Sequence, residues 1–238
     1  MLRRACLLTA AVALGAALLA VPGVLPGPAA TPVPETVPRV AAVTGAPAAP
    51  EPPSEDARAG VLGSEVPPVG TGVPVVVPGS APAPGPGRVR TVRVEVEGGL
   101  PVDGPAFADF VLDTLNDPRG WGRDGSMSFA RTDGDAEVTV VLASPDTSAR
   151  LCLPLRTGGT LSCRNGPLVV LTHHRWVLAH PDYGTDRTAY RQYVVNHEVG
   201  HFLGHGHVPC PGPDVAAPVM MQQTKGLLGC APNPWPYP

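Results

Sequence analysis

The stretch NHEVGHFLGHGH at residues 196–207 limits the fold of this chain more than any other feature. His197 and His201 are four residues apart, so a helix places both imidazoles on one face. Gly204 follows three residues later, and glycine tolerates the left-handed backbone conformation in which a helix ends with a sharp turn. Such a turn allows His207 to approach the first two histidines. The spacing therefore predicts a helix that ends before Gly204 and three converging imidazoles.

Three neutral histidine nitrogens are the donor set of many catalytic zinc sites, because a tetrahedral ion then keeps its fourth position for water. Glu198 lies beside the first histidine and can reach that water without binding the metal. The sequence thus predicts one catalytic Zn²⁺ ion held by His197, His201 and His207, with Glu198 as the catalytic residue. The alternative is a helix with histidines on a polar face.

The segment HEVGHFLGHGH resembles the metzincin pattern H-E-x-x-H-x-x-G-x-x-H at every fixed position. Metzincins also have a Met-turn, whose methionine lies beneath the metal. The segment PVMMQ at 218–222 is similar to it, which implies Met220 as the Met-turn residue and Met221 as the alternative. Many metzincins carry a tyrosine two residues after this methionine, but this chain has Gln222 there. More narrowly, YVVNHEVGHFLGHGH, VMMQQTKG and PNPWP resemble a family of exported actinobacterial metzincin-like domains of unassigned role.

This resemblance implies a zinc metallopeptidase that hydrolyses peptide bonds with a zinc-activated water and Glu198 as general base. Gln222 and Gln223 are expected to wall the substrate pocket, and residues 167–172 to form an edge strand that pairs with an extended substrate. The expected partner is a protein or peptide, including a peptide cross-link of a cell wall. A zinc-stabilised, non-catalytic binding module of the cell envelope is the alternative. Nucleic acid is not an expected partner, because only 16% of the residues are charged and no basic run occurs.

Residues 88–238 are expected to form an α+β domain, the proposed metzincin-like zinc peptidase domain. Valine alternates with charged residues over 90–97, as in a half-buried strand. The resemblance implies a zincin-like fold, in which a mixed twisted sheet packs on two helices, with an active-site helix and an irregular C-terminal Met-turn subdomain. Further predicted elements are strands at 128–131, 137–143 and 167–172, helices from Asp103 to near Pro118 and from Thr185 or Asp186 to about Leu203, and a hairpin turn at Gly158–Gly159.

Residues 22–87 have a different composition from the rest of the chain. Roughly half of the 32 prolines lie between Pro22 and Pro86, where no aromatic residue occurs. Such a stretch buries too little apolar surface to offset its ordering entropy. The composition predicts a disordered, extended spacer over 22–87 that is rich in proline, alanine and glycine.

Residues 1–21 have the pattern of an export signal. Arg3 and Arg4 precede an uncharged, mostly apolar run over residues 5–21. A cleaved signal peptide is favoured over an N-terminal anchor that would hold the protein in the membrane through residues 5–21. Both interpretations predict a secreted protein or one on the extracellular face of the cell envelope.

Export places the remaining cysteines in an oxidising compartment, where disulfides persist. Four cysteines follow the apolar run and allow three connectivities. Sequence proximity favours the pairs Cys152–Cys163 and Cys210–Cys230.

Four further histidines have weaker interpretations. His205 occupies a variable position of the motif and is expected to be exposed to solvent. Asn196 either orients a metal ligand or is an ordinary helix residue. The other three histidines are expected to be surface or loop residues, with a place in the cleft or in a second metal site as the alternative: His173, His174 and His180.

Overall fold

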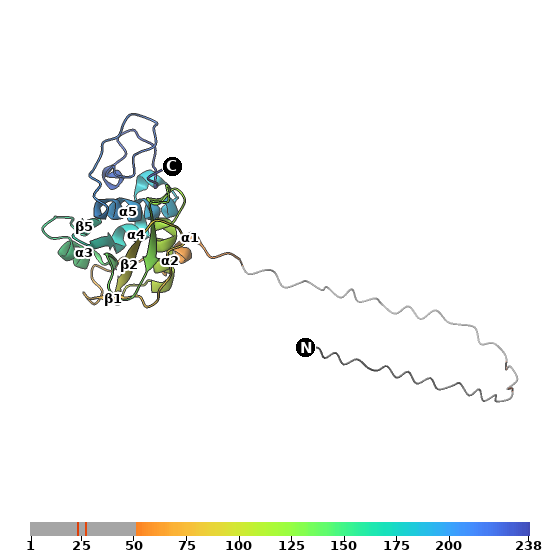
Figure 1. The fold of residues 1–238 in the computed structure, drawn as a ribbon. Coiled ribbons are helices and arrows are strands. Elements are labelled where there is room, and N and C mark those ends of the chain that lie inside the picture. The colour runs from red at the N-terminus through yellow and green to blue at the C-terminus, as the bar shows by residue number, and fades with distance from the viewer. Residues whose placement is uncertain (1–22, 24–26, 28–50) are drawn as a thin grey trace, which may run out of the picture. The chain divides into compact units, whose positions relative to one another are not determined.

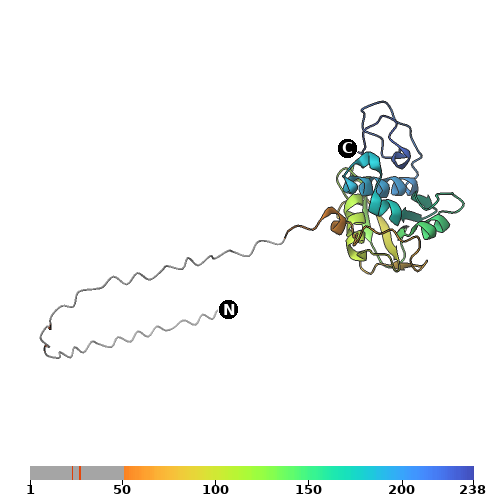
Figure 2. The same cartoon turned by 180° about the vertical axis from the view of Figure 1, so that it is seen from behind.

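A computed structural model of the chain describes residues 23, 27 and 51–238 (Figures 1 and 2). The predictions for residues 1–21, and for most of 22–50, lie outside the described residues. Within 51–238 the structure is α+β, with a six-stranded mixed sheet. Its strands are β1 (Pro74–Val76), β2 (Arg88–Glu97), β3 (Met127–Arg131), β4 (Val138–Ala143), β5 (Cys163–Asn165) and β6 (Leu168–Thr172). Its helices are α1 (Glu55–Arg58), α2 (Gly104–Leu115), α3 (Pro145–Leu151), α4 (His173–Leu178), α5 (Arg187–Phe202) and the 3-10 turns η1 (Pro181–Tyr183) and η2 (Gln223–Lys225).

The sheet has the strand order β1-β2-β4-β6-β5, and β3 also pairs with β2. Strands β2, β4 and β6 are parallel to one another, whereas β1 and β5 are antiparallel to their neighbours. Strand β4 is apolar along almost its whole length, as expected for a strand covered on both faces. Val140 and Leu142 join the main core, while Val141 and Ala143 face the smaller cluster that includes the Cys152–Cys163 disulfide.

The main core joins one face of the sheet to α2, α4 and α5. Phe107 and Phe110 of α2 meet the ring of Trp176 edge to face, with centroids 5.0 and 5.4 Å apart. Helix α5 lies between the sheet and the irregular C-terminal segment in both views (Figures 1 and 2). One side of α5 therefore completes the hydrophobic core, and the rest of the helix can position side chains for a site.

The prediction of a spacer that reaches residue 87 is wrong for residues 51–87. Asp56 accepts a hydrogen bond of 2.6 Å from Arg191, whose side chain is fully buried in α5. The Ala59 carbonyl accepts one from the Trp176 indole at 2.9 Å, and β1 pairs with β2. This segment has too few apolar residues for a core of its own, but it is ordered because it docks on a core built by the rest of the domain.

The prediction of a hairpin turn at Gly158–Gly159 is wrong. The antiparallel strands β5 and β6 pair Asn165 with Leu168, so Gly166 and Pro167 form the turn, with Gly166 at φ +59°. The chain from residue 152 to 162 is instead a loop closed by a disulfide. Consequently residues 167–172 do not form an edge strand: β6 is paired on both sides, and β5 is the edge.

Both predicted disulfides are present, Cys152–Cys163 and Cys210–Cys230. Two disulfides indicate an oxidising environment, such as an extracellular compartment. Among residues 51–238, none of the helices is both long and apolar enough to span a bilayer.

Candidate metal centre

Helix α5 begins and ends as its sequence predicts. The side chain of Asp186 caps the helix by accepting a hydrogen bond of 2.8 Å from the Ala189 amide. The helix continues to Phe202, and Gly204 then adopts a left-handed conformation at φ +98°. The chain folds back at this point, since the His205 amide donates to the Gly200 carbonyl at 2.9 Å. This reversal brings the segment after α5 beside the helix.

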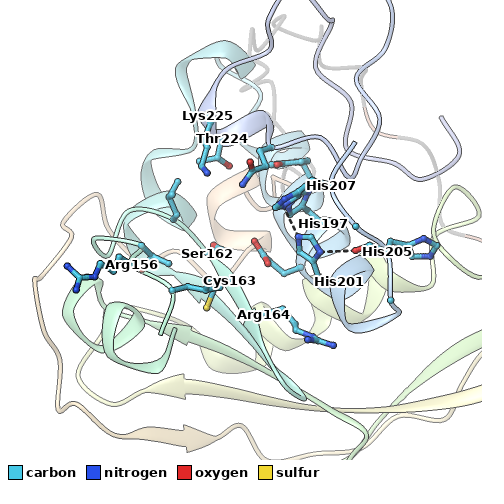
Figure 3. A pocket seen from close by; sticks show the side chains of 18 residues that line it. Arg156, Ser162, Cys163, Arg164, His197, His201, His205, His207, Thr224 and Lys225 are labelled. Atoms are coloured by element: carbon cyan, nitrogen blue, oxygen red, sulfur yellow. Dashed lines mark hydrogen bonds between the residues drawn. The ribbon is translucent and has the colours of Figure 1, made fainter. Parts of the chain in front are cut away.

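Three imidazoles converge on one point. The nitrogens that His197, His201 and His207 can offer to a metal all lie within 4.8 Å of one another. The Nε2 atoms of His201 and His207 are 3.0 Å apart, near the roughly 3.3 Å expected for two nitrogens on one tetrahedral ion. In Figure 3 the rings of these residues point toward one another at the side of the cleft.

Backbone carbonyls orient the two histidines of α5. The Nδ1 atom of His197 lies 2.8 Å from the Val219 carbonyl, and that of His201 lies 2.9 Å from the His205 carbonyl. In this arrangement each Nδ1 carries the proton, which leaves each Nε2 lone pair free for a metal. The donor chemistry thus fits a divalent ion that prefers imidazole nitrogen.

Burial favours the neutral form of two of the three histidines, His197 and His207, as metal binding requires. It lowers the pKa of His197 to about 3, with a smaller opposing effect of the hydrogen bond to Val219. It also lowers the pKa of His207, and the nearby His201 adds to that shift. At neutral pH these two rings can therefore bind a cation without first losing a proton.

Glu198 is buried beside the histidines and lines the same cleft. Burial raises the pKa of its carboxyl to about 8. Within residues 51–238 no group donates a hydrogen bond to this carboxylate, so nothing described in the protein offsets its desolvation. A cation held by the three histidines would do so, because a nearby positive charge favours the ionised carboxylate. The buried carboxylate of Glu198 and a cation at the three histidines would therefore stabilise each other.

Met220 lies in a tight turn against α5. The Met221 amide donates to the Pro218 carbonyl at 2.8 Å, which closes this turn. Gly200 lies between His197 and His201 in the sequence, and a Cβ atom there would lie 2.5 Å from the sulfur of Met220. Only glycine at this position therefore allows Met220 to come so close to α5. Met221 points elsewhere and packs near the Cys210–Cys230 disulfide. The geometry favours Met220 over Met221 as the methionine beside the histidines.

Only one of the two glutamines expected in the pocket wall lies there. Gln222 lines the cleft, as predicted. The prediction for Gln223 is wrong, because its side chain is fully buried away from the cleft. It accepts hydrogen bonds from the Tyr183 hydroxyl at 2.7 Å and the Asn233 amide at 3.1 Å, and it donates to the Asn233 carbonyl at 2.7 Å. Gln223 therefore holds the C-terminal segment together.

The other histidines and Asn196 take varied positions. His205 is exposed, as predicted, but its ring also stacks on Trp121 with centroids 4.3 Å apart. His174 and His180 are half-buried and do not line the cleft. His173 is fully buried, against the prediction of a surface position, and neither of its ring nitrogens has a partner within the described residues. The side chain of Asn196 donates to the Pro234 carbonyl at 3.0 Å, so it fastens the tail to α5.

Sequence reasoning missed several residues of the cleft. Tyr193 lines it and donates to the Met221 carbonyl at 2.9 Å, linking α5 to the methionine turn. Its spacing of four before His197 places it on the same face of the helix, which was a usable signal. Arg156, Arg164 and Lys225 also line the cleft. No sequence pattern identifies these three, because separate segments of the chain bring them to the cleft.

Comparison with known families assigns the domain. A family model described as protein of unknown function (DUF3152) matches residues 61–229. The chain belongs to this family. The match to DUF3152 begins within the docked segment 51–87 and includes α5 and the histidine cluster. No curated protein and no solved structure matches the chain.

Proposed function

We propose that this protein is a zinc-dependent endopeptidase of the metzincin type, with a zincin-like fold. The observation that carries the proposal is the convergence of His197, His201 and His207 beside the buried carboxyl of Glu198. A purely structural metal site gains nothing from a buried acidic side chain such as Glu198 beside the ligands.

The residues of the chain have distinct roles in this proposal. The carbonyls of Val219 and His205 fix the rings of His197 and His201, so the metal position is set before substrate binds. Zinc bound there would supply Lewis acidity, which activates water and polarises a peptide carbonyl. Glu198 accepts a proton from the attacking water and returns it to the leaving amine.

The shape of the cleft suits an extended peptide. Its volume is about 580 Å³, and it runs along the edge strand β5 beside the three histidines. The free backbone groups of an edge strand can pair with a peptide, which would place its carbonyl groups along the cleft. Gln222 also lines the cleft, where it can contact the same peptide.

The disulfides support an exported protein, secreted or held on the extracellular face of the cell envelope. The peptide bonds that it cleaves would belong to proteins or to peptide cross-links outside the cell.

The test combines metal analysis with an endopeptidase assay on the zinc-loaded protein. Glu198→Gln should keep one zinc per chain and lose about 1000-fold in kcat, because it removes only the general base. Glu65→Gln is the matched control, since Glu65 is exposed and outside the cleft. Full activity of Glu198→Gln would refute the mechanism. A wild-type protein that binds zinc but cleaves neither casein nor cell-wall peptides would point instead to the non-catalytic binding module.

A further inference from the structure

Three cations surround the cleft, and they come from both of its walls. Arg156 lies in the loop closed by the Cys152–Cys163 disulfide, and Arg164 follows that disulfide directly on β5. Lys225 belongs to η2, inside the segment closed by Cys210–Cys230. Figure 3 shows Lys225 toward the top of the view and Arg156 and Arg164 lower down, with His197, His201 and His207 on the right.

These three cations have no interaction partner within residues 51–238, unlike all the other arginines of that range. Arg156, Arg164 and Lys225 form no hydrogen bond, ion pair or aromatic contact through their charged groups within the described residues. The other eleven arginines each have such a partner: Arg58, Arg88, Arg90, Arg93, Arg119, Arg123, Arg131, Arg150, Arg175, Arg187 and Arg191. The unpartnered cations of the domain therefore gather at one place, the cleft that holds the candidate metal centre.

The cleft has little negative charge to balance them. Glu198 is the sole acidic residue among those that line it, and it lies buried beside the histidines rather than at the rim. The chain as a whole carries a formal net charge of -3, so the positive cleft is a local feature. A concave site lined by one sign of charge attracts ligands of the opposite sign.

We propose that the substrate is a peptide with Asp or Glu side chains close to the cleaved bond, an inference that rests on the proposed peptidase function. Arg156 and Arg164 contact acidic side chains along β5, and Lys225 contacts one on the opposite wall. The disulfides restrain the segments that carry these cations, which lowers the entropic cost of ordering them around a substrate.

A peptide fits this arrangement better than a polyanion such as nucleic acid does. The three cations stand on separate segments and form no continuous basic track of the kind that follows a phosphate backbone. The edge strand β5 carries Arg164, and its backbone groups suit a peptide.

The test uses three fluorogenic peptides of the same length and central sequence, flanked by Glu, Gln or Lys. For each peptide, kcat/KM is measured with the zinc-loaded protein, and Kd is measured with the zinc-free protein by fluorescence anisotropy. The Glu peptide should have a kcat/KM about 10-fold higher and a Kd about 10-fold lower than the Gln peptide, and the Lys peptide should be the poorest substrate and the weakest ligand. The preference should shrink as salt rises from about 0.05 M to about 0.5 M.

Charge reversal assigns the preference to the cleft. The double variant Arg156→Glu/Arg164→Glu should favour the Lys peptide over the Glu peptide. Arg58→Glu is the matched control, because Arg58 is exposed on α1 outside the cleft, and it should keep the wild-type preference.

The outcomes separate this inference from the proposed function. Cleavage of all three peptides with equal kcat/KM and equal Kd would overturn the acidic preference and leave the peptidase intact. Failure to cleave any peptide, with Glu-selective binding preserved, would refute the peptidase and keep the acidic-ligand cleft. A single-stranded oligonucleotide that competes more strongly than the Glu peptide would overturn the assignment to peptides.

Discussion

Residues 51–202 and residues 203–238 build the same cleft, but different interactions hold them in place. The first region contains the sheet, all the α-helices and most of the core, so backbone ladders and apolar packing fix its side chains. In the second region η2 is the one regular element, and the Cys210–Cys230 disulfide and buried side-chain hydrogen bonds fix the chain. The first supplies His197, His201 and Glu198, and the second supplies His207.

The two regions also differ in how fully their buried polar groups are paired. All buried side-chain nitrogen and oxygen atoms that lack a hydrogen-bond partner among the described residues belong to residues 51–202, and His173 contributes both of its ring nitrogens. In 203–238 side chains such as Gln223 and Asn233 take the place of backbone ladders. An irregular segment can thus be as well defined as a sheet, provided that its buried polar groups are satisfied.

The largest effect is expected from removing one of the proposed metal ligands from each region. His201→Ala and His207→Ala should each weaken zinc binding about 1000-fold, because each removes roughly a third of the metal's binding free energy. Competition against a chelator of known affinity measures this loss. His205→Ala is the matched control: its side chain does not face the other rings, and its carbonyl still orients His201. A zinc affinity unchanged in His207→Ala would show that the irregular region does not contribute to the centre.

A smaller effect is expected from Gln223→Ala, which tests whether side-chain hydrogen bonds hold the irregular region. The variant should lose about 3 kcal/mol in the free energy of unfolding, because it leaves buried groups of Tyr183 and Asn233 without partners. Denaturant unfolding measures the change. Gln222→Ala, one residue earlier on the cleft wall, should change stability by less than about 0.5 kcal/mol. Equal losses in the two variants would contradict the proposed role of Gln223.

The smallest effect concerns His173 in the regular region. Burial lowers the pKa of this ring from 6.5 to about 4, so the folded protein holds it neutral while the unfolded chain protonates it. Stability should therefore fall as pH drops below 6.5, by about 1 kcal/mol on reaching about pH 5.5. His173→Phe should lack this part of the acid sensitivity in denaturant unfolding at both pH values. The same pH dependence in both proteins would show that the ring is not held neutral by burial.

Local patterns predicted much of the fold. The alternation over β2, the N-cap of α2 at Asp103 and the limits of α5 all agree with the structure, because each depends on residues a few positions apart. The α+β class and both disulfides were also predicted. Errors arose where distant partners decide the structure, as for the edge strand β5 and for Asp56, which meets Arg191 135 residues later.

The sequence by itself determined the three histidines and Glu198, because the helical repeat and one glycine turn are enough to bring these side chains together. Only the tertiary structure decided that Gln223 is buried while Gln222 faces the cleft, and that Arg156, Arg164 and Lys225 meet around it. The physical reason is that burial and pairing of a side chain depend on segments far away in the chain. The residues next to it in the sequence do not indicate which distant segments it will contact.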